Sequence, residues 1–420
     1  MSHIAIIGAG ITGITTAYAL LKQGHEVTVF DRNRYAAMET SFANGGQLSA
    51  YNAEVWNNWG TVLKGMKWIL RKDAPLLMNP KPSWHKYSWL TEFMLNIPKY
   101  QNNTVATAKL AIEAREHLYR IAEEEGINFD LEKRGILHVY RNEAGYRHAE
   151  KVNALLTRAG LDRRAVSPEE AKQIEPALTG SLYGGFFTPS DATGDIHKFT
   201  RGLADAAMRK GLNFIGDADV ENLSHTGNGI KISWRSNSCP EKSDGEKAQF
   251  DAVVICAGIG SRRFASMLGD RVNIYPVKGY SITINLDSEM CQKAAPWVSL
   301  LDDDAKIVTS RLGLNRLRVA GTAEYNGDNR DIRHDRIRPL VEWSRGFFPG
   351  MSTSNVVPWA GLRPMMPDMM PRVGAGSKPR VFYNTGHGHL GWTLSAVTAE
   401  MITQQICMAF PAGEREKQAA

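Results

Sequence analysis

The chain has 420 residues, 43% of them hydrophobic and 22% charged, which excludes a disordered or fibrous protein and indicates a soluble globular one. This length is more than one hydrophobic core usually organises, so we expect two domains. The formal net charge of +6 suits anionic small molecules, nucleotide phosphates or an acidic membrane surface without selecting one, and no basic stripe indicates nucleic-acid binding. The 4 cysteines show no CxxC spacing, as in a reduced, cytoplasmic protein.

The N-terminal segment 3–31 has the pattern of a strand, a glycine turn, a helix and a second strand. Gly8, Gly10 and Gly13 form a GxGxxG motif between the first strand and the helix. In this motif the first glycine permits a tight turn, the second lets a pyrophosphate approach the backbone, and the third lets helix and strand pack closely. Asp31 ends the second strand, where an acidic side chain accepts hydrogen bonds from ribose hydroxyls. The combination predicts a dinucleotide-binding unit and does not distinguish FAD from NAD.

The uncharged stretch 4–21 is long enough to suggest a signal peptide or a transmembrane helix. No basic region precedes it, no small-residue cleavage site stands out, and glycines and threonines interrupt it, so we expect neither. No other segment is long and apolar enough to span a bilayer, and we therefore expect a soluble or peripheral protein.

Helical and strand patterns alternate along the rest of the chain. Residues 52–125 look mostly helical around a proline-rich break at 74–84. Residues 195–211 predict a helix that Asp195 can cap and Gly211 can end. We expect strands at 135–140, 229–234, 250–258, 280–286, 306–310 and 317–321, and a short helix at 169–178. The last three strands look like an antiparallel sheet of a second domain.

Seven short motifs carry a resemblance to known flavoproteins. The stretches "FDAVVICAGIGS" (250–261), "GGFFTPSDATGDIHKF" (184–199) and "RVFYNTGHGHLGWTLSAVTAEMI" (380–402) resemble the D-amino-acid oxidase and glutathione-reductase-like superfamily. In this order, "SFANGGQLSA" (41–50), "PVKGYSITI" (276–284), "GLRPMMPD" (361–368) and "NTGHGHLGWTLS" (384–395) resemble the small subunits of bacterial D-amino-acid dehydrogenases over nearly the whole chain. Glycine oxidases and sarcosine oxidases are more distant relatives.

The resemblance implies an α/β protein in which a Rossmann-like FAD-binding domain is interleaved with an α+β substrate domain built on an antiparallel sheet. We expect 1–85, 195–265 and 355–420 in the FAD-binding domain, and 86–194 and 266–354 in the substrate-binding domain.

The GxGxxG motif and the motifs shared with the flavoproteins named above together give a set of expected FAD-binding residues. They are Gly8, Gly10, Ile11, Thr12, Gly13, Asp31, Arg32, Asn44, Gly45, Gly46, Gln47, Leu48, Val220, Ala257, Gly258, Gly386, His387, Gly388, His389, Leu390, Gly391, Trp392 and Thr393. The resemblance places the GHGHLGW turn against the flavin, with the N-terminus of a following helix, roughly 393–407, near its pyrimidine end, and the backbone of Val220 near the adenine. A metal site at His387 and His389 is not expected, because no third and fourth ligand lies nearby in the sequence. Sarcosine oxidases attach their flavin through a cysteine near the motif that matches "LRPMMPD", and none lies there in this chain, so FAD is expected to be non-covalent.

Five residues are candidates for binding the substrate. Arg363 is expected to hold the substrate carboxylate, as an arginine in the same GLRP setting does in glycine oxidase, with a structural ion pair as the alternative. His389 stands where relatives carry a second arginine. Tyr280 could line the pocket or pack in the core, and Lys278 could approach flavin N5 or be a solvated strand residue. Tyr51 follows the "ANGGQLSA" loop and either alters the pocket or has no role in it.

The resemblance implies oxidative deamination of D-amino acids to 2-oxo acids and ammonia. The hydride would pass from the substrate Cα to flavin N5, and the electrons would go to a quinone or another carrier. Two alternatives remain: an oxidase of the glycine, sarcosine or D-amino-acid type that uses O₂, and a D-hydroxyproline dehydrogenase.

The segment 55–72 has an apolar stripe at helical spacing with a basic complement. The stripe consists of Trp56, Trp59, Leu63, Met66 and Leu70, accompanied by Lys64, Lys67, Trp68, Arg71 and Lys72. Such a helix either packs its stripe on the flavin domain, which is the commoner arrangement and the one we expect, or lies among anionic lipid headgroups close to a quinone. The resemblance implies a peripheral enzyme on the inner face of the bacterial inner membrane, which makes the second arrangement a serious alternative.

Overall fold

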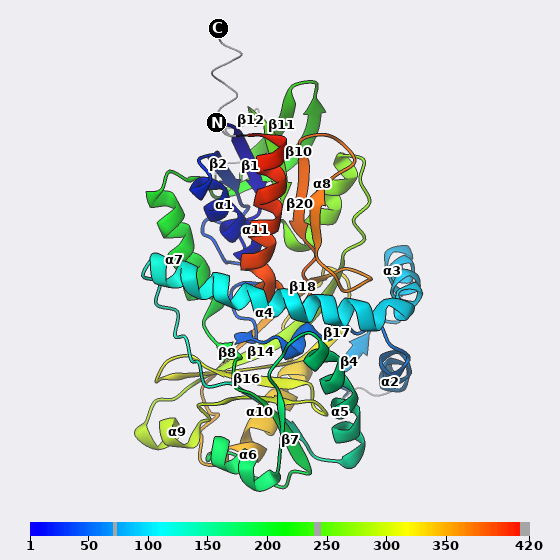
Figure 1. The fold of residues 1–420 in the computed structure, drawn as a ribbon, viewed down its shortest axis with the longest axis vertical. Helices are drawn as coiled ribbons and strands as arrows, with labels where there is room; N and C mark the ends of the chain where they lie inside the picture. The colour runs from blue at the N-terminus through cyan, green and yellow to red at the C-terminus, as the bar shows by residue number, and fades with distance from the viewer. Residues whose placement is uncertain (70–73, 239–244, 412–420) are drawn as a thin grey trace.

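The computed structural model describes residues 1–69, 74–238 and 245–411. It has two sheet-centred parts, one above the other in Figure 1, with a long helix crossing between them. The helices are α1 (Ile11–Lys22), α2 (Trp59–Ile69), α3 (Trp84–Leu95), α4 (Tyr100–Glu124), α5 (Glu143–Arg158), α6 (Pro168–Ile174), α7 (Ile196–Arg209), α8 (Ser261–Met267), α9 (Glu289–Ala294), α10 (His334–Phe347) and α11 (Gly391–Ala409), with a short 3₁₀ turn η1 (Tyr51–Ala53). The strands are β1 (His3–Ile7), β2 (Glu26–Phe30), β3 (Gln47–Leu48), β4 (Leu76–Met78), β5 (Ile136–Tyr140), β6 (Arg164–Val166), β7 (Gly184–Thr188), β8 (Ala192–Thr193), β9 (Asn213–Ile215), β10 (Ala218–Thr226), β11 (Gly229–Ser236), β12 (Glu246–Phe250), β13 (Ala252–Ile255), β14 (Tyr275–Asn285), β15 (Ser299–Asp302), β16 (Ile307–Arg311), β17 (Arg316–Tyr325), β18 (Val356–Met365), β19 (Arg372–Ala375) and β20 (Val381–Thr385).

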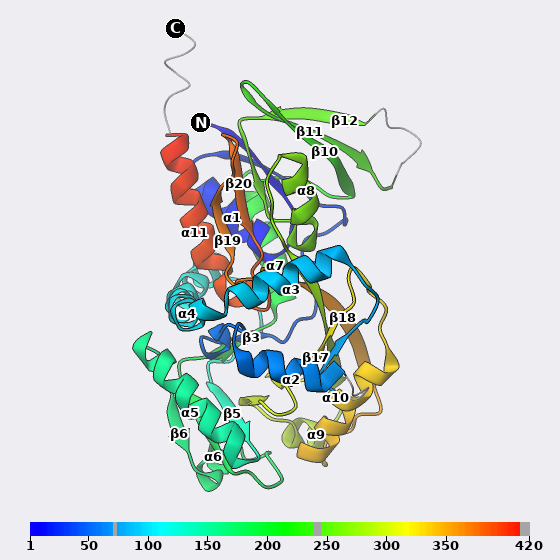
Figure 2. The same ribbon diagram turned by 90° about the vertical axis from the view of Figure 1, so that its right-hand side faces the viewer.

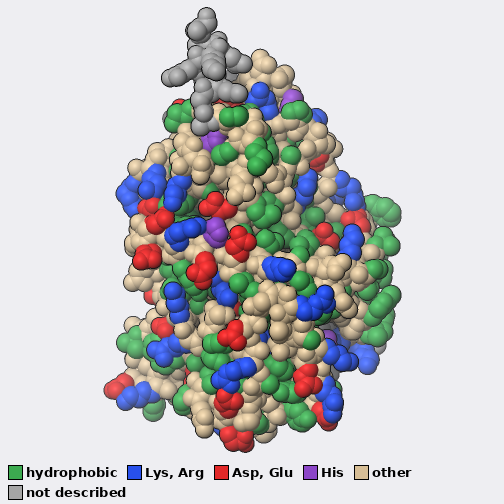
Figure 3. Space-filling view, in the orientation of Figure 1, with side chains coloured by type: hydrophobic (Ala, Val, Ile, Leu, Met, Phe, Trp, Pro, Cys, Tyr) green, Lys and Arg blue, Asp and Glu red, His purple; other side chains and the backbone are tan. Residues whose placement is uncertain are grey.

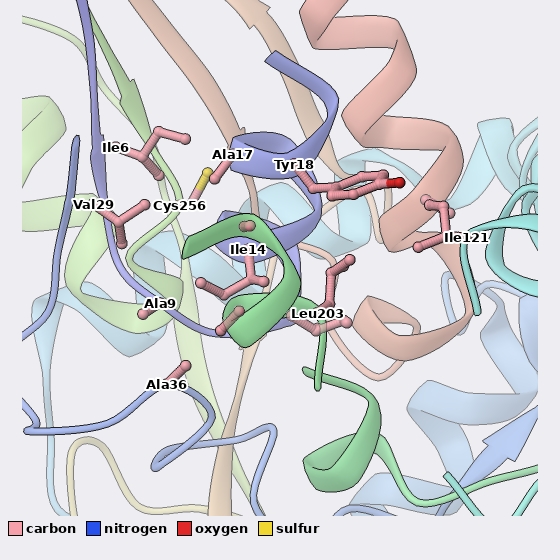
Figure 4. Close-up of a cluster of buried hydrophobic side chains, with 14 of the residues drawn as sticks. Ile6, Ala9, Ile14, Ala17, Tyr18, Val29, Ala36, Ile121, Leu203 and Cys256 are labelled. Carbon is pink, nitrogen blue, oxygen red and sulfur yellow. The ribbon is translucent and has the colours of Figure 1, made fainter. Parts of the chain in front are cut away.

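The upper part is built on a 6-stranded sheet in the order β19-β20-β13-β1-β2-β9. Its inner strands pair in parallel and are buried on both faces, as their short apolar runs predict. On one face, Ile6 and Val29 meet Ile14 of α1 and Leu203 of α7 (Figure 4). The small sheet β10-β11-β12 covers the other face. The predicted strand–turn–helix–strand unit is confirmed, and Asp195 caps α7 by accepting from the backbone N–H groups of two residues in its first turn.

The lower part is a 9-stranded sheet that has the order β18-β14-β17-β16-β15-β5-β7-β6 and includes β4, which pairs with β17 beside this path. The pairs β14–β17 and β16–β17 are antiparallel, which confirms the sheet predicted from 280–286, 306–310 and 317–321. Helix α10 packs on β14 and β17 over a separate core. The division into two domains stays a prediction, and β18 belongs to this lower sheet although its residues fall within 355–420.

The expected packing of the 55–72 stripe on the flavin domain is wrong for the residues of α2. Trp59, Leu63 and Met66 are 63%, 54% and 54% exposed. Their helix packs on the short strand β4 and lies on the side of the molecule that faces the viewer in Figure 2. Trp56 instead lies just before α2 and stacks on His389. The side chain of Trp68 and residues Leu70, Arg71 and Lys72 lie outside the described part of the chain.

The neighbouring helix α3 extends this exposed apolar area. Its side chains Trp84, Tyr87, Met94 and Leu95 are exposed. Hydrophobic side chains gather along the edge of the molecule where α2 and α3 lie (Figure 3). We call the exposed apolar residues of these two helices the α2–α3 surface. No helix in the described ranges combines the length and the apolar character that a membrane span requires.

Candidate functional site

A cavity of about 1780 Å³ lies between the two sheets. Its wall includes the turn after β1, the end of β2, the loop before β3, strand β18 and the turn before α11. The ends of parallel strands in such α/β sheets are where nucleotides bind. The cavity therefore joins the predicted dinucleotide site to the predicted substrate residues.

The glycine turn after β1 forms a cradle that larger residues could not form. Gly8 has a φ of +107°, and a Cβ there would lie 2.6 Å from the carbonyl oxygen of Cys256. A Cβ on Gly13 would lie 1.9 Å from the carbonyl oxygen of Gly8, so this glycine allows α1 to pack against the turn. Gly10 precedes α1 without a side-chain cap and lines the cavity. The N–H of Ile11 donates to the hydroxyl of Ser41 at 3.0 Å, while Gly10 and Thr12 at the same helix N-terminus line the cavity, where a pyrophosphate can bind.

Acidic and basic groups surround the nucleotide end of the cavity. Asp31 lines the cavity and accepts a hydrogen bond of 2.7 Å from the backbone N–H of Ala9, and burial raises the pKa of its carboxyl. Arg32 pairs with Glu39. The carbonyl oxygen of Val220, which lines the same end, accepts a hydrogen bond from Arg263. A ribose at Asp31 and an adenine beside Val220 fit this arrangement.

The loop before β3 forms another wall of the cavity. Gly46 has a φ of +74° and its N–H bonds the side chain of Asn44 at 2.9 Å. Gln47 is held on both ends of its amide, by Ser299 at 2.7 Å and by Asn52 at 2.9 Å. These contacts fix the backbone of 44–47 along the cavity.

The GHGHLGW turn is shaped by left-handed glycines and two neutral histidines. Gly386 and Gly388 have φ values of +75° and +58°. His387 bonds Thr398 at 3.0 Å, and burial lowers the pKa of His387 to about 3. His389 donates from Nε2 to the carbonyl oxygen of Asn52 at 2.8 Å, and burial lowers its pKa to about 4. Both rings are therefore uncharged at neutral pH, and no group of three or more His, Cys, Asp or Glu side chains in the described residues could hold a metal ion.

Arg363 reaches the cavity from β18, and its guanidinium has no partner in the described part of the chain. It stands opposite Val277 in the β14–β18 pairing, and a Cβ on Gly279 would lie 2.5 Å from its guanidinium carbon, so the guanidinium lies over that glycine. Within the described residues it makes no hydrogen bond or ion pair. Burial lowers the pKa of Arg363 to about 10, which leaves it charged at neutral pH. An unpaired cation in a cavity is a ready partner for a carboxylate.

Tyr325 is a site residue that the sequence patterns did not indicate. It lines the cavity close to Arg363, is 6% exposed, and is held between the rings of Tyr275 and Trp89. Its hydroxyl makes no hydrogen bond with the described residues, and burial raises its pKa, which keeps it protonated. It comes to Arg363 because β17 and β18 both flank β14, a long-range pairing that local sequence does not encode.

Tyr280 and Lys278 belong to a buried polar network around Glu324. The Tyr280 hydroxyl donates to Glu324 at 2.6 Å, and the side chain lines the cavity wall while being only 1% exposed. Lys278 is 0% exposed, lies 3.2 Å from Glu324 and donates to the side chain of Asn329, so the alternative of a solvated lysine is wrong. Lys278 is not part of the cavity wall.

The remaining predicted residues divide between the wall and the packing behind it. Tyr51 lines the cavity, with its hydroxyl 3.3 Å from that of Tyr140 and the guanidinium of Arg163 over its ring. The residues that lie behind the cavity wall are Gly13, Leu48, Leu390 and Thr393. Cys256 does line the cavity beside Gly8, and burial raises the pKa of its thiol to about 12.

Comparisons with known proteins agree with this geometry. Over residues 3–405 the sequence matches a protein family described as FAD dependent oxidoreductase. The chain is similar to D-amino acid dehydrogenase 3 of Mesorhizobium japonicum, with 61% identity over 415 residues that cover 99% of each chain. It is also similar to the D-amino acid dehydrogenase of Paramagnetospirillum magneticum, with 40% identity over 96% of this chain and 94% of that one.

Solved structures share the fold at low sequence identity. Glycine oxidase from Geobacillus kaustophilus matches with a TM-score of 0.75 and 18% identity, covering 98% of this chain and 96% of that one. Iminodiacetate oxidase from Chelativorans matches with a TM-score of 0.72 and 18% identity over 98% of both chains. These similarities confirm the predicted α/β architecture.

Proposed function

This chain belongs to the family of FAD-dependent oxidoreductases, and we propose that it is a D-amino-acid dehydrogenase that converts D-amino acids to 2-oxo acids and ammonia and passes the electrons to a quinone or another carrier. Family membership confirms the predicted FAD cofactor. The observation that carries the proposal is the unpaired Arg363 in the same cavity as the glycine cradle and the GHGHLGW turn. The names of the similar enzymes support the choice of D-amino acids.

The residues of the cradle fit FAD at each of its groups. The backbone N–H groups of Gly10 and Thr12 at the N-terminus of α1 would hold the pyrophosphate, and Asp31 would accept from the ribose. The GHGHLGW turn and the N-terminus of α11 would face the isoalloxazine ring, where a helix N-terminus favours negative charge. When bound, FAD supplies N5 as the acceptor of the hydride from the substrate Cα.

Arg363 and Tyr325 would bind the substrate carboxylate together. A charged guanidinium and a protonated hydroxyl, neither of which has a hydrogen-bond partner among the described residues, can each donate to carboxylate oxygens. His389 donates its Nε2 proton to Asn52, so its Nδ1 is an acceptor, and this buried atom has no partner in the described residues. The ring of His389, which lines the cavity, would lie beside the substrate amine and so help to orient Cα.

Among the described residues, no side chain beside Arg363 and Tyr325 is a strong base. With a pKa of about 4, His389 is a poor proton acceptor at neutral pH. The neutral amine that hydride loss requires would therefore be taken from the free-amine fraction of the substrate. In this proposal the protein orients and desolvates the substrate, and the cofactor carries the chemistry.

An anaerobic screen of D- and L-amino acids, followed by absorbance of the flavin, tests the proposal. We expect bleaching by D-amino acids and slow recovery in air but rapid recovery with a soluble quinone. Fast recovery in air without quinone would make the protein an oxidase, and bleaching by cis-4-hydroxy-D-proline alone would make it a D-hydroxyproline dehydrogenase. Bleaching by L-amino acids alone would overturn the substrate class.

We also propose that the α2–α3 surface rests on an anionic membrane near the quinone pool. Trp59, Leu63 and Met66 are exposed on α2, and the exposed Lys64 and Lys67 lie on the same helix. Exposed apolar and aromatic residues flanked by lysines are typical of helices that lie in lipid headgroups. Helix α2 lies beside Trp56, and Trp56 stacks on His389 in the cavity wall. A membrane bound to α2 would therefore lie close to the flavin end of the cavity.

Liposome flotation tests the membrane proposal. Binding should rise with the fraction of anionic lipid and fall with salt, and Lys64→Glu with Lys67→Glu should abolish it. The matched control reverses two exposed lysines on β11 and β12, Lys231→Glu and Lys247→Glu, and should leave binding intact. Equal loss in both double variants, or binding that ignores lipid charge, would contradict it.

A further inference from the structure

The segment between η1 and α2 presents alternate side chains to the cavity. Ala53, Val55 and Asn57 are buried in the protein interior, at 0%, 1% and 0% exposure. The intervening residues Asn52, Glu54, Trp56 and Asn58 all line the cavity. From Glu54, which follows η1, to Trp56 the chain is extended, and neighbouring side chains of an extended chain point to opposite sides. Glu54 therefore stands on the same side as Trp56, about 6.6 Å away along the chain.

No described cation forms an ion pair with the Glu54 carboxylate, although His148 and Lys306 of the facing wall act to lower its pKa. Its Oε1 accepts a hydrogen bond of 2.6 Å from the hydroxyl of Tyr100. No ion pair and no second hydrogen bond reaches this carboxylate within the described residues. Burial raises the pKa of Glu54, while the Tyr100 hydrogen bond opposes the rise. One oxygen of an enclosed carboxylate is thus left to whatever enters the cavity, and an unsatisfied group of this kind is costly.

The facing wall contains charges that already have partners. It is formed by the start of α5 and the turn between β15 and β16. Lys306 pairs with Asp303 at 2.5 Å, and Asp304 accepts from the side chain of Asn142 at 2.7 Å. His148 is the other titratable group of this wall. In the described part of the chain, Asp303 and Asp304, like Glu54, each bind a partner through one oxygen only, and Glu54 differs from them by lying on the same segment as Trp56, next to the proposed substrate site.

The part of the cavity between Glu54 and this facing wall begins at the proposed carboxylate site. Trp56 stacks on His389 with ring centroids 4.7 Å apart, and the carbonyl of Asn52 holds the same histidine. A substrate whose carboxylate lies on Arg363 and whose amine faces His389 has its side chain left to extend along Trp56 toward Glu54. This placement follows from the order of residues along the alternating segment.

We infer that Glu54 is a specificity-determining residue that selects D-amino acids whose side chain carries a hydrogen-bond donor, an ammonium, a guanidinium or a hydroxyl, over those with purely aliphatic side chains. The inference rests on the proposed function and deepens it by naming the substrate class. A charged donor gains most, because it also neutralises the enclosed carboxylate. An aliphatic side chain leaves the free oxygen unpaired, and sites built to bond a polar group reject the analogue that lacks it.

The test compares kcat/KM for matched substrate pairs with wild-type protein, Glu54→Gln and Glu54→Leu. The pairs are D-lysine with D-norleucine, and cis-4-hydroxy-D-proline with D-proline. In the wild type the polar member should be preferred in at least one pair by roughly tenfold to a hundredfold, the range of a hydrogen bond to a charged group. Glu54→Leu should remove that preference, with the flavin spectrum intact.

Glu54→Gln separates the two kinds of donor. An amide oxygen still accepts from a hydroxyl, so a preference for the hydroxylated substrate should largely survive this substitution. A preference for the cation should be lost, because the amide has no charge. Glu289→Gln, on the exposed helix α9, is the matched control and should leave every ratio unchanged.

Two outcomes would overturn the inference. One is a wild-type enzyme that prefers the apolar member of both pairs; the other is a polar preference that Glu54→Leu leaves intact. If no D-amino acid at all bleaches the flavin of the wild type, the proposed function itself fails, and this result is distinct from a change in ratios.

Discussion

Arg363 is the group on which the proposed chemistry depends most. Arg363→Ala should lower kcat/KM strongly, because a buried carboxylate that loses its charged partner costs on the order of 2–5 kcal/mol. FAD content should stay the same, because the residue lies at the substrate end of the cavity. Stopped-flow reduction of the flavin at increasing substrate concentration measures the loss, and Arg363→Lys should recover part of it. Normal substrate binding by the alanine variant would move the carboxylate site to Tyr325, His389 or Tyr280.

The two histidines of the turn before α11 make stability depend on pH. Their pKa values of about 3 for His387 and about 4 for His389 lie below the ordinary value near 6.5. A group whose pKa is lower in the folded state than in the unfolded state contributes its full stabilisation at pH values above the unfolded-state pKa. This contribution is lost as the pH falls toward the folded-state pKa. The melting temperature should therefore fall between pH 6.5 and pH 4. His387→Gln should flatten that slope, and an unchanged slope would show that other groups control it.

Strand pairing, rather than any single side chain, aims Arg363 at the cavity. Gly279 of β14 leaves room for the guanidinium, since a Cβ there would lie 2.5 Å from it. Gly279→Ala should displace the guanidinium and weaken substrate binding about tenfold or more, with FAD content preserved, because small shifts of a positioning group are costly. The control Gly346→Ala in α10 has open space around it and should behave as wild type. Substrate titration of flavin bleaching distinguishes the two variants.

Elements set by local chemistry could be predicted from the sequence. The cradle of Gly8 and Gly13, the cap at Asp195 and the alternating strands of the second sheet each depend on neighbouring residues, and all are present. Tyr325 and Glu54 could not be placed, because their roles depend on which strands pair and on which side of an extended segment the cavity lies. The stripe of α2 was misjudged for a related reason: an amphipathic pattern is the same whether its apolar side meets a core or remains exposed.

The cavity joins both sheets, so FAD should act as a structural link as well as a cofactor. Residues of the first part, such as Asp31, and of the second, such as Arg363, line one space of about 1780 Å³. A ligand that binds the folded state stabilises it by about 2.7 kcal/mol when its free concentration is a hundredfold above Kd. Removing FAD should therefore lower the melting temperature, and adding FAD back should restore it in a concentration-dependent way.

The link should be non-covalent, because the cysteine in the cavity wall, Cys256, lies beside Gly8 at the nucleotide end and burial keeps its thiol protonated, with a pKa of about 12. Acid precipitation should then release yellow FAD into the supernatant. Flavin colour that stays with the pellet would contradict the non-covalent attachment, and equal melting temperatures with and without FAD would contradict its role as a link between the two parts.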